Sequence, residues 1–148
     1  MRLTLMLLGL WLPVPAEAAG DAGKAMAMAA DTICGEAGRD EKLSNLVAGT
    51  IANRMALEKG GRARKLLAVL TAPRQYVGSC LRNGRKPTEW HRHLARTLLE
   101  RRLGSIPLPA WFTPETRWFS TARGRPAPWR RGVRKVGRYL GVDFFEKR

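Results

Sequence analysis

The chain has 148 residues, of which 45% are apolar, and it carries 27 Lys and Arg against 12 Asp and Glu. This length and apolar content are typical of one globular domain and exclude a wholly disordered chain. The formal net charge of +15 predicts an anionic partner, such as nucleic acid, a membrane surface or a cell wall.

The N-terminus has the pattern of a secretory signal peptide. Arg2 precedes an apolar run from Leu3 to Leu12, and Ala16-Glu17-Ala18 is an A-x-A cleavage signal. We predict a signal peptide at residues 1–18 and an exported domain at residues 19–148, located in the periplasm, the cell wall or outside the cell. An N-terminal anchor that is never cut is the alternative. No other stretch has the roughly 18 apolar residues of a membrane span, so we expect no stable membrane insertion after cleavage.

The chain has two cysteines, Cys34 and Cys80. In an exported protein this even count favours a disulfide, which would close a loop of about 45 residues and stabilise the fold by about 3–4 kcal/mol. Two buried free thiols are the alternative. No second Cys or His lies at ligand spacing from either cysteine, and His91-x-His93 stands alone. We therefore predict no metal site and no cofactor.

Capping residues and apolar spacing predict four helices. The first begins at Asp21 and runs to about Cys34, so that Glu36 falls just beyond its end in a turn between Gly35 and Gly38. The others are a helix capped by Asp40 that runs to about Leu57, a shorter one at Arg64–Thr71, and an amphipathic one at Thr88–Leu103.

The C-terminal part is more basic and less regular. Residues 1–58 carry five basic and seven acidic side chains, whereas residues 59–148 carry 22 basic and five acidic ones. The Gly- and Pro-rich residues 124–132 predict an exposed loop. Two short aromatic segments, Thr116–Thr121 and Gly141–Glu146, are predicted to pair as strands. The fold class is therefore mainly α (α+β), with a small antiparallel β element near the C-terminus.

Glu36 is the strongest candidate for chemistry, because nucleophile-elbow, P-loop, dinucleotide and zinc-protease motifs are all absent from the sequence. A carboxyl group at the junction of two apolar helices would be partly desolvated, which raises its pKa and lets it hold a proton near neutral pH. Such an acid can protonate a glycosidic oxygen. From the spacing alone, a solvated turn glutamate or a helix cap is the alternative.

The segment TICGEAGRDE at residues 32–41, followed by LVAGTIANR at 46–54, resembles the opening signature of the SleB-like cell wall hydrolases, which include the spore-cortex-lytic enzymes. The positions that match in type are Gly35, Glu36, Ala37, Glu41, Val47, Ala48, Asn53 and Arg54. Gly38-Arg39 stands where the family has Arg-Gly, and Asp40 is an extra residue. Further on, PRQY at 73–76 resembles Pro-Gly-Gln-Phe, and LGVDFF at 140–145 resembles Ile-Gly-Asn-His-Val-Phe, with Asp143 in place of His.

This resemblance extends from Asp31 to Glu146 and implies a lysozyme-like helical domain that cleaves peptidoglycan between N-acetylmuramic acid and N-acetylglucosamine. It implies that Glu36 acts as general acid and then base, as in lytic transglycosylases, where the C6 hydroxyl of muramic acid attacks C1 and leaves an anhydro product. A hydrolase with two carboxylates would need a second acid about 5–9 Å away. Only Asp40, Glu41 or a distant acid such as Asp143 could serve, so a mechanism with one acid is the simpler prediction.

Four further residues are predicted to bind substrate, and each has a structural alternative. Gln75 and Tyr76 could line the sugar groove, since an amide pairs with acetamido groups and an aromatic face packs on pyranose rings. Trp118 could do the same, although Tyr76 and Trp118 could also lie in the core. Asn53 is a candidate too, but bracing the helix junction fits it better.

We expect a monomer whose partner is the glycan strand of peptidoglycan, held in part by the basic surface. Export and the absence of a binding motif argue against nucleic acid. The alternative function is a non-catalytic, basic peptidoglycan-binding protein with the same fold.

Overall fold

The computed structural model describes residues 16–73, 76–100, 103–121 and 131–148. Its α-helices are α1 (Ala16–Ala37), α2 (Glu41–Met55), α3 (Arg62–Thr71) and α4 (Glu89–Glu100), with short 3-10 turns η1 (Leu81–Asn83) and η2 (Leu103–Ser105). The strands are β1 (Thr116–Thr121), β2 (Val133–Tyr139) and β3 (Val142–Lys147). The fold is thus mixed, with a helical part and a small sheet formed by the C-terminal residues, as the sequence predicts.

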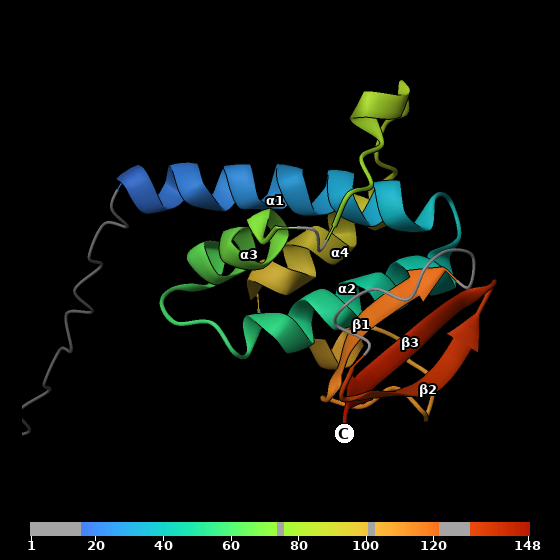
Figure 1. Cartoon of the computed structure of the whole chain (residues 1–148). Helices are drawn as coiled ribbons and strands as arrows, with labels where there is room; N and C mark the ends of the chain where they lie inside the picture. Colours follow the sequence, from blue (N-terminus) through green and yellow to red (C-terminus); the bar gives the residue numbers. More distant parts are fainter. Residues whose placement is uncertain (1–15, 74–75, 101–102, 122–130) are drawn as a thin grey trace, which may run out of the picture.

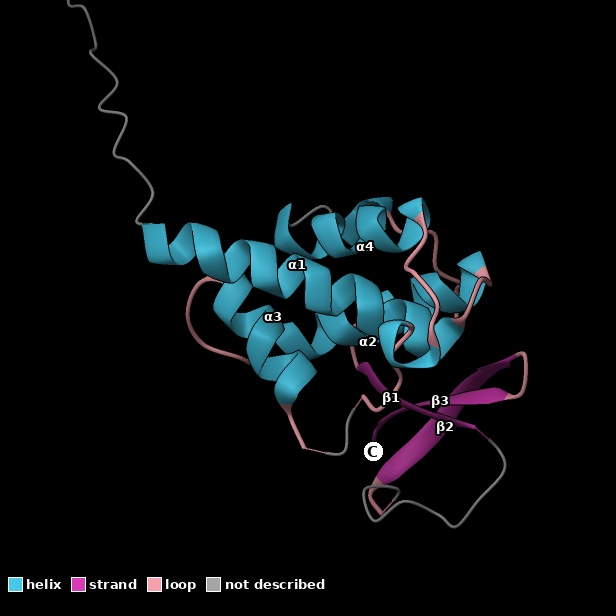
Figure 2. Ribbon diagram, turned by 90° about the horizontal axis from the view of Figure 1, so that it is seen from above, coloured by secondary structure: helices cyan, strands magenta, loops and turns pink. Residues whose placement is uncertain are grey.

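The helices pack around α1, which contacts the other three along its length. In Figure 1, α2 lies between the remaining helices and the sheet, and Figure 2 shows the sheet to one side of the helical part. The core joins the two parts, because side chains of α1, α2, α4 and β3 form one apolar cluster. Its largest fully buried members include Ile33, Ile51, Leu94, Leu98 and Phe144.

The first helix is longer than predicted, and this changes the setting of Glu36. The helix α1 continues to Ala37, so Glu36 lies in its last turn and not beyond its end. Gly35 does not stop the helix. Gly38 does: its φ is 63°, and its N–H donates to the Cys34 carbonyl oxygen at 2.8 Å. The predicted signal peptide falls mostly outside the described residues, with Ala16–Ala18 in the first turn of α1.

The other helices begin and end close to their predicted bounds. Asp40 caps α2 as predicted, because its Oδ1 accepts a hydrogen bond from the Leu43 N–H at 2.7 Å. The helix α2 ends at Met55, two residues before the predicted end. None of the helices in the described ranges combines the length and apolarity that crossing a membrane requires.

The sheet is antiparallel in the order β1-β3-β2, so the two predicted strands pair with each other. The strand β2 was not predicted; it is an edge strand rich in Arg and Lys, with an irregular register near Val136. A two-residue turn joins β2 to β3, with positive φ at Leu140 (45°) and Gly141 (75°). Most of the predicted loop at 124–132 lies outside the described residues.

His91 makes the stability of the helical part depend on pH. The His91 side chain is 1% exposed, and its Nδ1 accepts the backbone N–H of Thr88 at 2.9 Å. Burial lowers the pKa of His91 below its ordinary value of 6.5, although a hydrogen bond with the Gly38 backbone opposes this. The unfolded chain therefore binds a proton at His91 more readily than the folded protein does. The stability that the neutral ring provides is complete above pH 6.5 and falls as the pH drops through the folded pKa.

We expect the free energy of unfolding, measured with urea from pH 7.5 down to 5, to decrease with falling pH. The decrease should be smaller in His91→Asn, whose side-chain oxygen can still accept the Thr88 N–H. The exposed His93 provides the control, and His93→Asn should follow the native protein. Equal pH slopes for His91→Asn and the native protein would rule out this role of His91.

Candidate functional site

Glu36 lies where the end of α1 meets the loop after α3. Its Oε1 accepts two backbone hydrogen bonds, from the N–H of Val77 at 2.9 Å and of Gly78 at 2.7 Å. The carboxylate is half-buried, so it is held in one orientation but remains accessible from solvent. The alternative of a solvated turn glutamate does not describe this geometry, because the side chain bridges two segments 41 and 42 residues apart.

The two segments meet at a pair of glycines. A Cβ atom on Gly35 would lie 2.2 Å from the backbone carbon of Gly78 and 2.2 Å from the backbone nitrogen of Ser79. A Cβ atom on Gly78 would lie 2.5 Å from the backbone carbon of Gly35. Neither position can hold a side chain without moving backbone, and this close approach brings the Val77 and Gly78 amides within reach of Glu36.

Further contacts fasten the same loop to α1. Asp31 accepts a hydrogen bond from the Ser79 hydroxyl at 2.7 Å and another from the Leu81 N–H at 2.9 Å. Cys34 and Cys80 are joined by a disulfide, with their Cα atoms 5.6 Å apart. We call residues 76–81 the clamped loop. Contacts with Asp31, Cys34 and Glu36 of α1 hold this loop in place. The loop in turn holds the Glu36 side chain in one position.

Tyr76 begins the clamped loop and lies beside Glu36. Its ring packs against Phe119 of β1, with the centroids 6.0 Å apart, and the Arg54 guanidinium carbon lies 5.5 Å from its centroid. Burial raises the pKa of Tyr76; the Arg54 charge opposes this shift, and the Glu36 charge adds to it. The hydroxyl therefore stays protonated at neutral pH.

The Tyr76 hydroxyl is buried and makes no hydrogen bond of ordinary geometry among the described residues. Thr50 and Arg54 nevertheless lie close enough to lower its pKa somewhat. The hydroxyl is shielded from solvent and lies among α2 side chains, so Tyr76 packs the clamped loop against α2 and β1.

Two of the three other predicted acids have structural partners. Asp40 caps α2, and its Oδ2 accepts a hydrogen bond from the Tyr139 hydroxyl at 3.3 Å. Hydrogen bonds from Arg138 at 2.6 and 3.0 Å, together with Lys135 at 2.8 Å, hold the pKa of Asp143 well below its usual range. Glu41 is exposed in the first turn of α2. Asp40 and Asp143 thus stabilise the fold.

Asn53 and Trp118, two further predicted site residues, do not gather around Glu36. The Asn53 side-chain amide donates to the carbonyl oxygens of Thr113 and Thr116, both at 2.8 Å, so it braces the start of β1. Successive side chains on a strand alternate between faces. Since Phe119 packs on Tyr76 and on the core residue Phe144, the neighbouring Trp118 faces the other side of the sheet. Trp118 therefore cannot line a groove shared with Tyr76. Gln75 lies outside the described residues.

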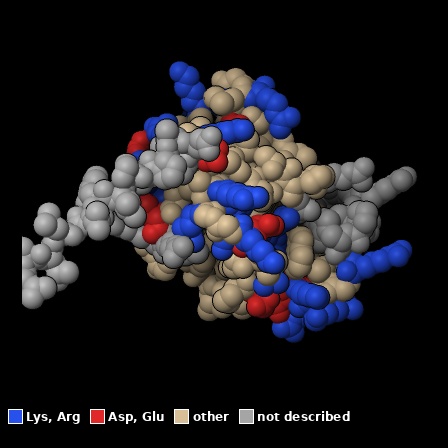
Figure 3. Space-filling view, turned by 90° about the vertical axis from the view of Figure 1, so that its left-hand side faces the viewer, with Lys and Arg blue, Asp and Glu red and all other residues tan. Residues whose placement is uncertain are grey.

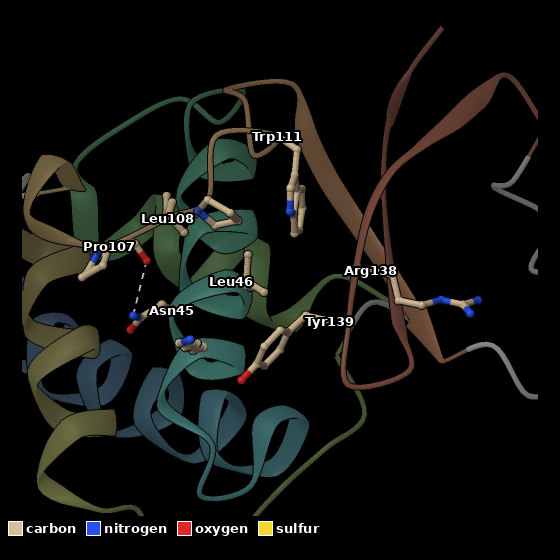
Figure 4. A pocket seen from close by; sticks show the side chains of 9 residues that line it. Asn45, Leu46, Pro107, Leu108, Trp111, Arg138 and Tyr139 are labelled. Carbon is tan, nitrogen blue, oxygen red and sulfur yellow. Dashed lines mark hydrogen bonds between the residues drawn. The ribbon is translucent and has the colours of Figure 1, made fainter.

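A second feature, which the sequence did not predict, is a pocket of about 350 Å³ beside the N-terminal half of α2. Figure 4 shows Trp111 and Tyr139 projecting into the same space, with Leu46 between them on α2 and Leu108 to one side. None of the predicted site residues in the described ranges lines this pocket. A Trp next to a Pro-rich run, PLPAW at residues 107–111, was the signal available in the sequence.

Basic side chains are spread over the surface. On the face seen in Figure 3, Lys and Arg are interleaved with a few acidic side chains. On the sheet, Arg134 pairs with Glu146, and Lys135 and Arg138 pair with Asp143, so three cations face two carboxylates. No group of three or more His, Cys, Asp or Glu side chains within the described ranges could hold a metal ion.

Comparison of the chain with known proteins found no matching family model, no similar curated protein and no similar solved structure.

Proposed function

We propose that the protein is exported and cleaves the glycan strands of peptidoglycan at the bond between N-acetylmuramic acid and N-acetylglucosamine. Glu36 is the one carboxyl group in the reaction. The observation that carries this proposal is the setting of Glu36, whose half-buried carboxylate is oriented by the Val77 and Gly78 amides and remains accessible from solvent. We also propose that the protein is a member of the SleB-like hydrolases and that its fold is lysozyme-like.

The proposed reaction returns Glu36 to its starting state. Among the described residues both amide hydrogen bonds go to Oε1, so we assign proton transfer to Oε2. Protonated Glu36 gives its proton to the glycosidic oxygen as the bond from C1 of muramic acid breaks. The C6 hydroxyl of the same sugar then bonds to C1 and passes its proton to Glu36, which leaves a 1,6-anhydro end.

This route needs no second carboxylate, which agrees with the structural partners of Asp40 and Asp143. A retaining or inverting glycosidase with two acids would place its second carboxyl group about 5–9 Å from the first. Asp143 forms ion pairs with Arg138 and Lys135 on the sheet, so its carboxylate serves the stability of the sheet and not the reaction.

A non-catalytic peptidoglycan-binding protein is the second candidate, and one observation favours it. The hydrogen bonds that Glu36 accepts from the two backbone amides make it a structural link between α1 and the clamped loop, a role that a binding protein would also need. The net positive charge of the surface would then hold the protein on stem-peptide carboxylates in a salt-dependent way.

Incubation of the secreted, oxidised protein with purified sacculi separates the two candidates. We expect soluble muropeptides to accumulate in the supernatant over time, and we expect added salt to weaken sedimentation of the protein with the sacculi. Protein that sediments with sacculi but releases no soluble fragments would contradict cleavage and favour the binding protein.

A further inference from the structure

The pocket beside α2 is built from three segments that are distant in the sequence. Leu46 comes from α2, Leu108 and Trp111 from the loop before β1, and Tyr139 from the end of β2. In Figure 4 the Arg138 side chain points away from this space. Its guanidinium group pairs with Asp143 on the sheet and does not enter the pocket. The pocket therefore has an apolar floor and two half-exposed aromatic side chains.

The Trp111 ring is held firmly, which makes it a preformed binding surface. It lies against the backbone of Gly137, where an added Cβ would come within 2.3 Å of the ring, and it packs on Phe144 with the centroids 5.5 Å apart. A rigid aromatic face loses little conformational entropy when a ligand packs on it. The size of the pocket falls within the range of small-ligand sites, about 300–1,000 Å³.

Polar groups that line the pocket indicate a ligand that has hydrogen-bonding groups as well as an apolar face. The Asn45 amide oxygen accepts the Trp90 indole N–H at 3.0 Å, while its nitrogen is 3.4 Å from the Pro107 carbonyl oxygen. The nitrogen has a second hydrogen, and the Tyr139 oxygen, which donates to Asp40 Oδ2 at 3.3 Å, can still accept a hydrogen bond. The exposed Lys42 adds a positive charge. An apolar, aromatic surface with donors and acceptors at its rim suits a pyranose ring, whose faces are apolar and whose edge carries hydroxyl groups.

We propose that this pocket binds one N-acetylhexosamine ring of a glycan strand, with Lys42 next to a carboxylate-bearing substituent of the sugar. The choice of this sugar class rests on the proposed function. Glu36 does not line this pocket, whose described lining comes from α2, the loop before β1 and the end of β2. The pocket would hold a strand on the protein independently of the cleavage step.

Two probes test binding without any cleavage, because neither contains the bond that Glu36 is proposed to cut. One is the neutral trimer of N-acetylglucosamine; the other is the disaccharide in which N-acetylglucosamine precedes N-acetylmuramic acid, which carries a lactyl carboxylate. Each is titrated into isotopically labelled full-length protein, and the backbone amide signals are followed by NMR. We expect both probes to shift amide signals at residues 42–46, 108, 110, 111 and 139, and we expect binding of the disaccharide to be sensitive to salt.

Substitutions in the pocket test which side chains contact each probe. Tyr139→Ala should weaken binding of both probes by about tenfold, and Tyr139→Phe by less than about threefold, because the ring face contributes most of the contact. Lys42→Ala should weaken only the carboxylated disaccharide, by about threefold. Trp118→Ala, an aromatic change on the outer face of the sheet, is the matched control and should leave binding unchanged. If Tyr139→Ala does not fold, Leu108→Asp tests the same pocket from its exposed side.

Signal shifts confined to Tyr76–Gly78, or equal affinities of the native protein and the folded pocket variants, would overturn this proposal. Failure of the proposed function is a distinct result: pocket shifts with both probes in a protein that releases no muropeptides would support the pocket and contradict cleavage.

Discussion

Replacing Glu36 with glutamine is expected to lower the rate of muropeptide release by at least about a hundredfold, the usual contribution of a general acid or base. The amide oxygen of glutamine can still accept the N–H groups of Val77 and Gly78, so the clamped loop should stay in place. Only the ability to give and take a proton is lost. The rate is measured as soluble muropeptide released from sacculi per unit time, and the thermal midpoint of unfolding checks the fold.

Asp31→Asn is the matched control. Asp31 is also a carboxylate on α1 that accepts hydrogen bonds from the clamped loop, at Ser79 and Leu81, but it has no part in the proposed reaction. This variant should lose some stability and keep most of its activity. If Glu36→Gln and Asp31→Asn lose activity equally, Glu36 acts only as a structural link.

Replacing Gly35 with alanine is expected to destabilise the fold by about 3 kcal/mol, at the upper end of the usual cost of overpacking. The new methyl carbon would lie 2.2 Å from backbone atoms of Gly78 and Ser79, and backbone cannot yield as the end of a long side chain can. The loop would have to move away from α1, which also strains the bonds to Glu36 and Asp31. Denaturant unfolding measures the loss, and muropeptide release should fall with it.

Gly23 supplies the control within the same helix. An added Cβ there meets no atom within 4 Å, so Gly23→Ala should leave the packing intact and raise stability by about 0.5–1 kcal/mol through helix propensity. A Gly35→Ala protein as stable as the native one would show that the loop does not need this close approach.

Local signals predicted most of the elements, because caps and apolar spacing act over a few residues. Asp40 begins α2 as expected, and Thr116–Thr121 is a strand with the predicted bounds. β2 was missed because its Arg and Lys side chains and its irregular register hide the alternation of a strand. The end of α1 was misplaced because glycine disfavours helix. Gly35 is accommodated there by its contact with Gly78, 43 positions later, which local patterns do not encode.

The candidate site was predictable only in part for the same reason. The motif around Glu36 singled out one residue, and the tyrosine after Gln75 lies beside it in the fold. The amides that orient Glu36 belong to the backbone and leave no pattern in side-chain types. Trp118 and Asn53 were assigned by residue type, but strand alternation turns Trp118 to the outer face, and carbonyl groups occupy the Asn53 amide. The pocket of Trp111 and Tyr139 forms only when the sheet folds back on α2.

The most direct test of cleavage by a single carboxyl group is mass spectrometry of the fragments that the native protein releases from purified peptidoglycan, with Glu36→Gln as the blank. The proposal predicts fragments ending in 1,6-anhydromuramic acid from the native protein and none from the variant. Fragments with reducing ends would show that water, and not the C6 hydroxyl, attacks C1, which would contradict the proposed mechanism. No fragments from the native protein would contradict glycan cleavage itself.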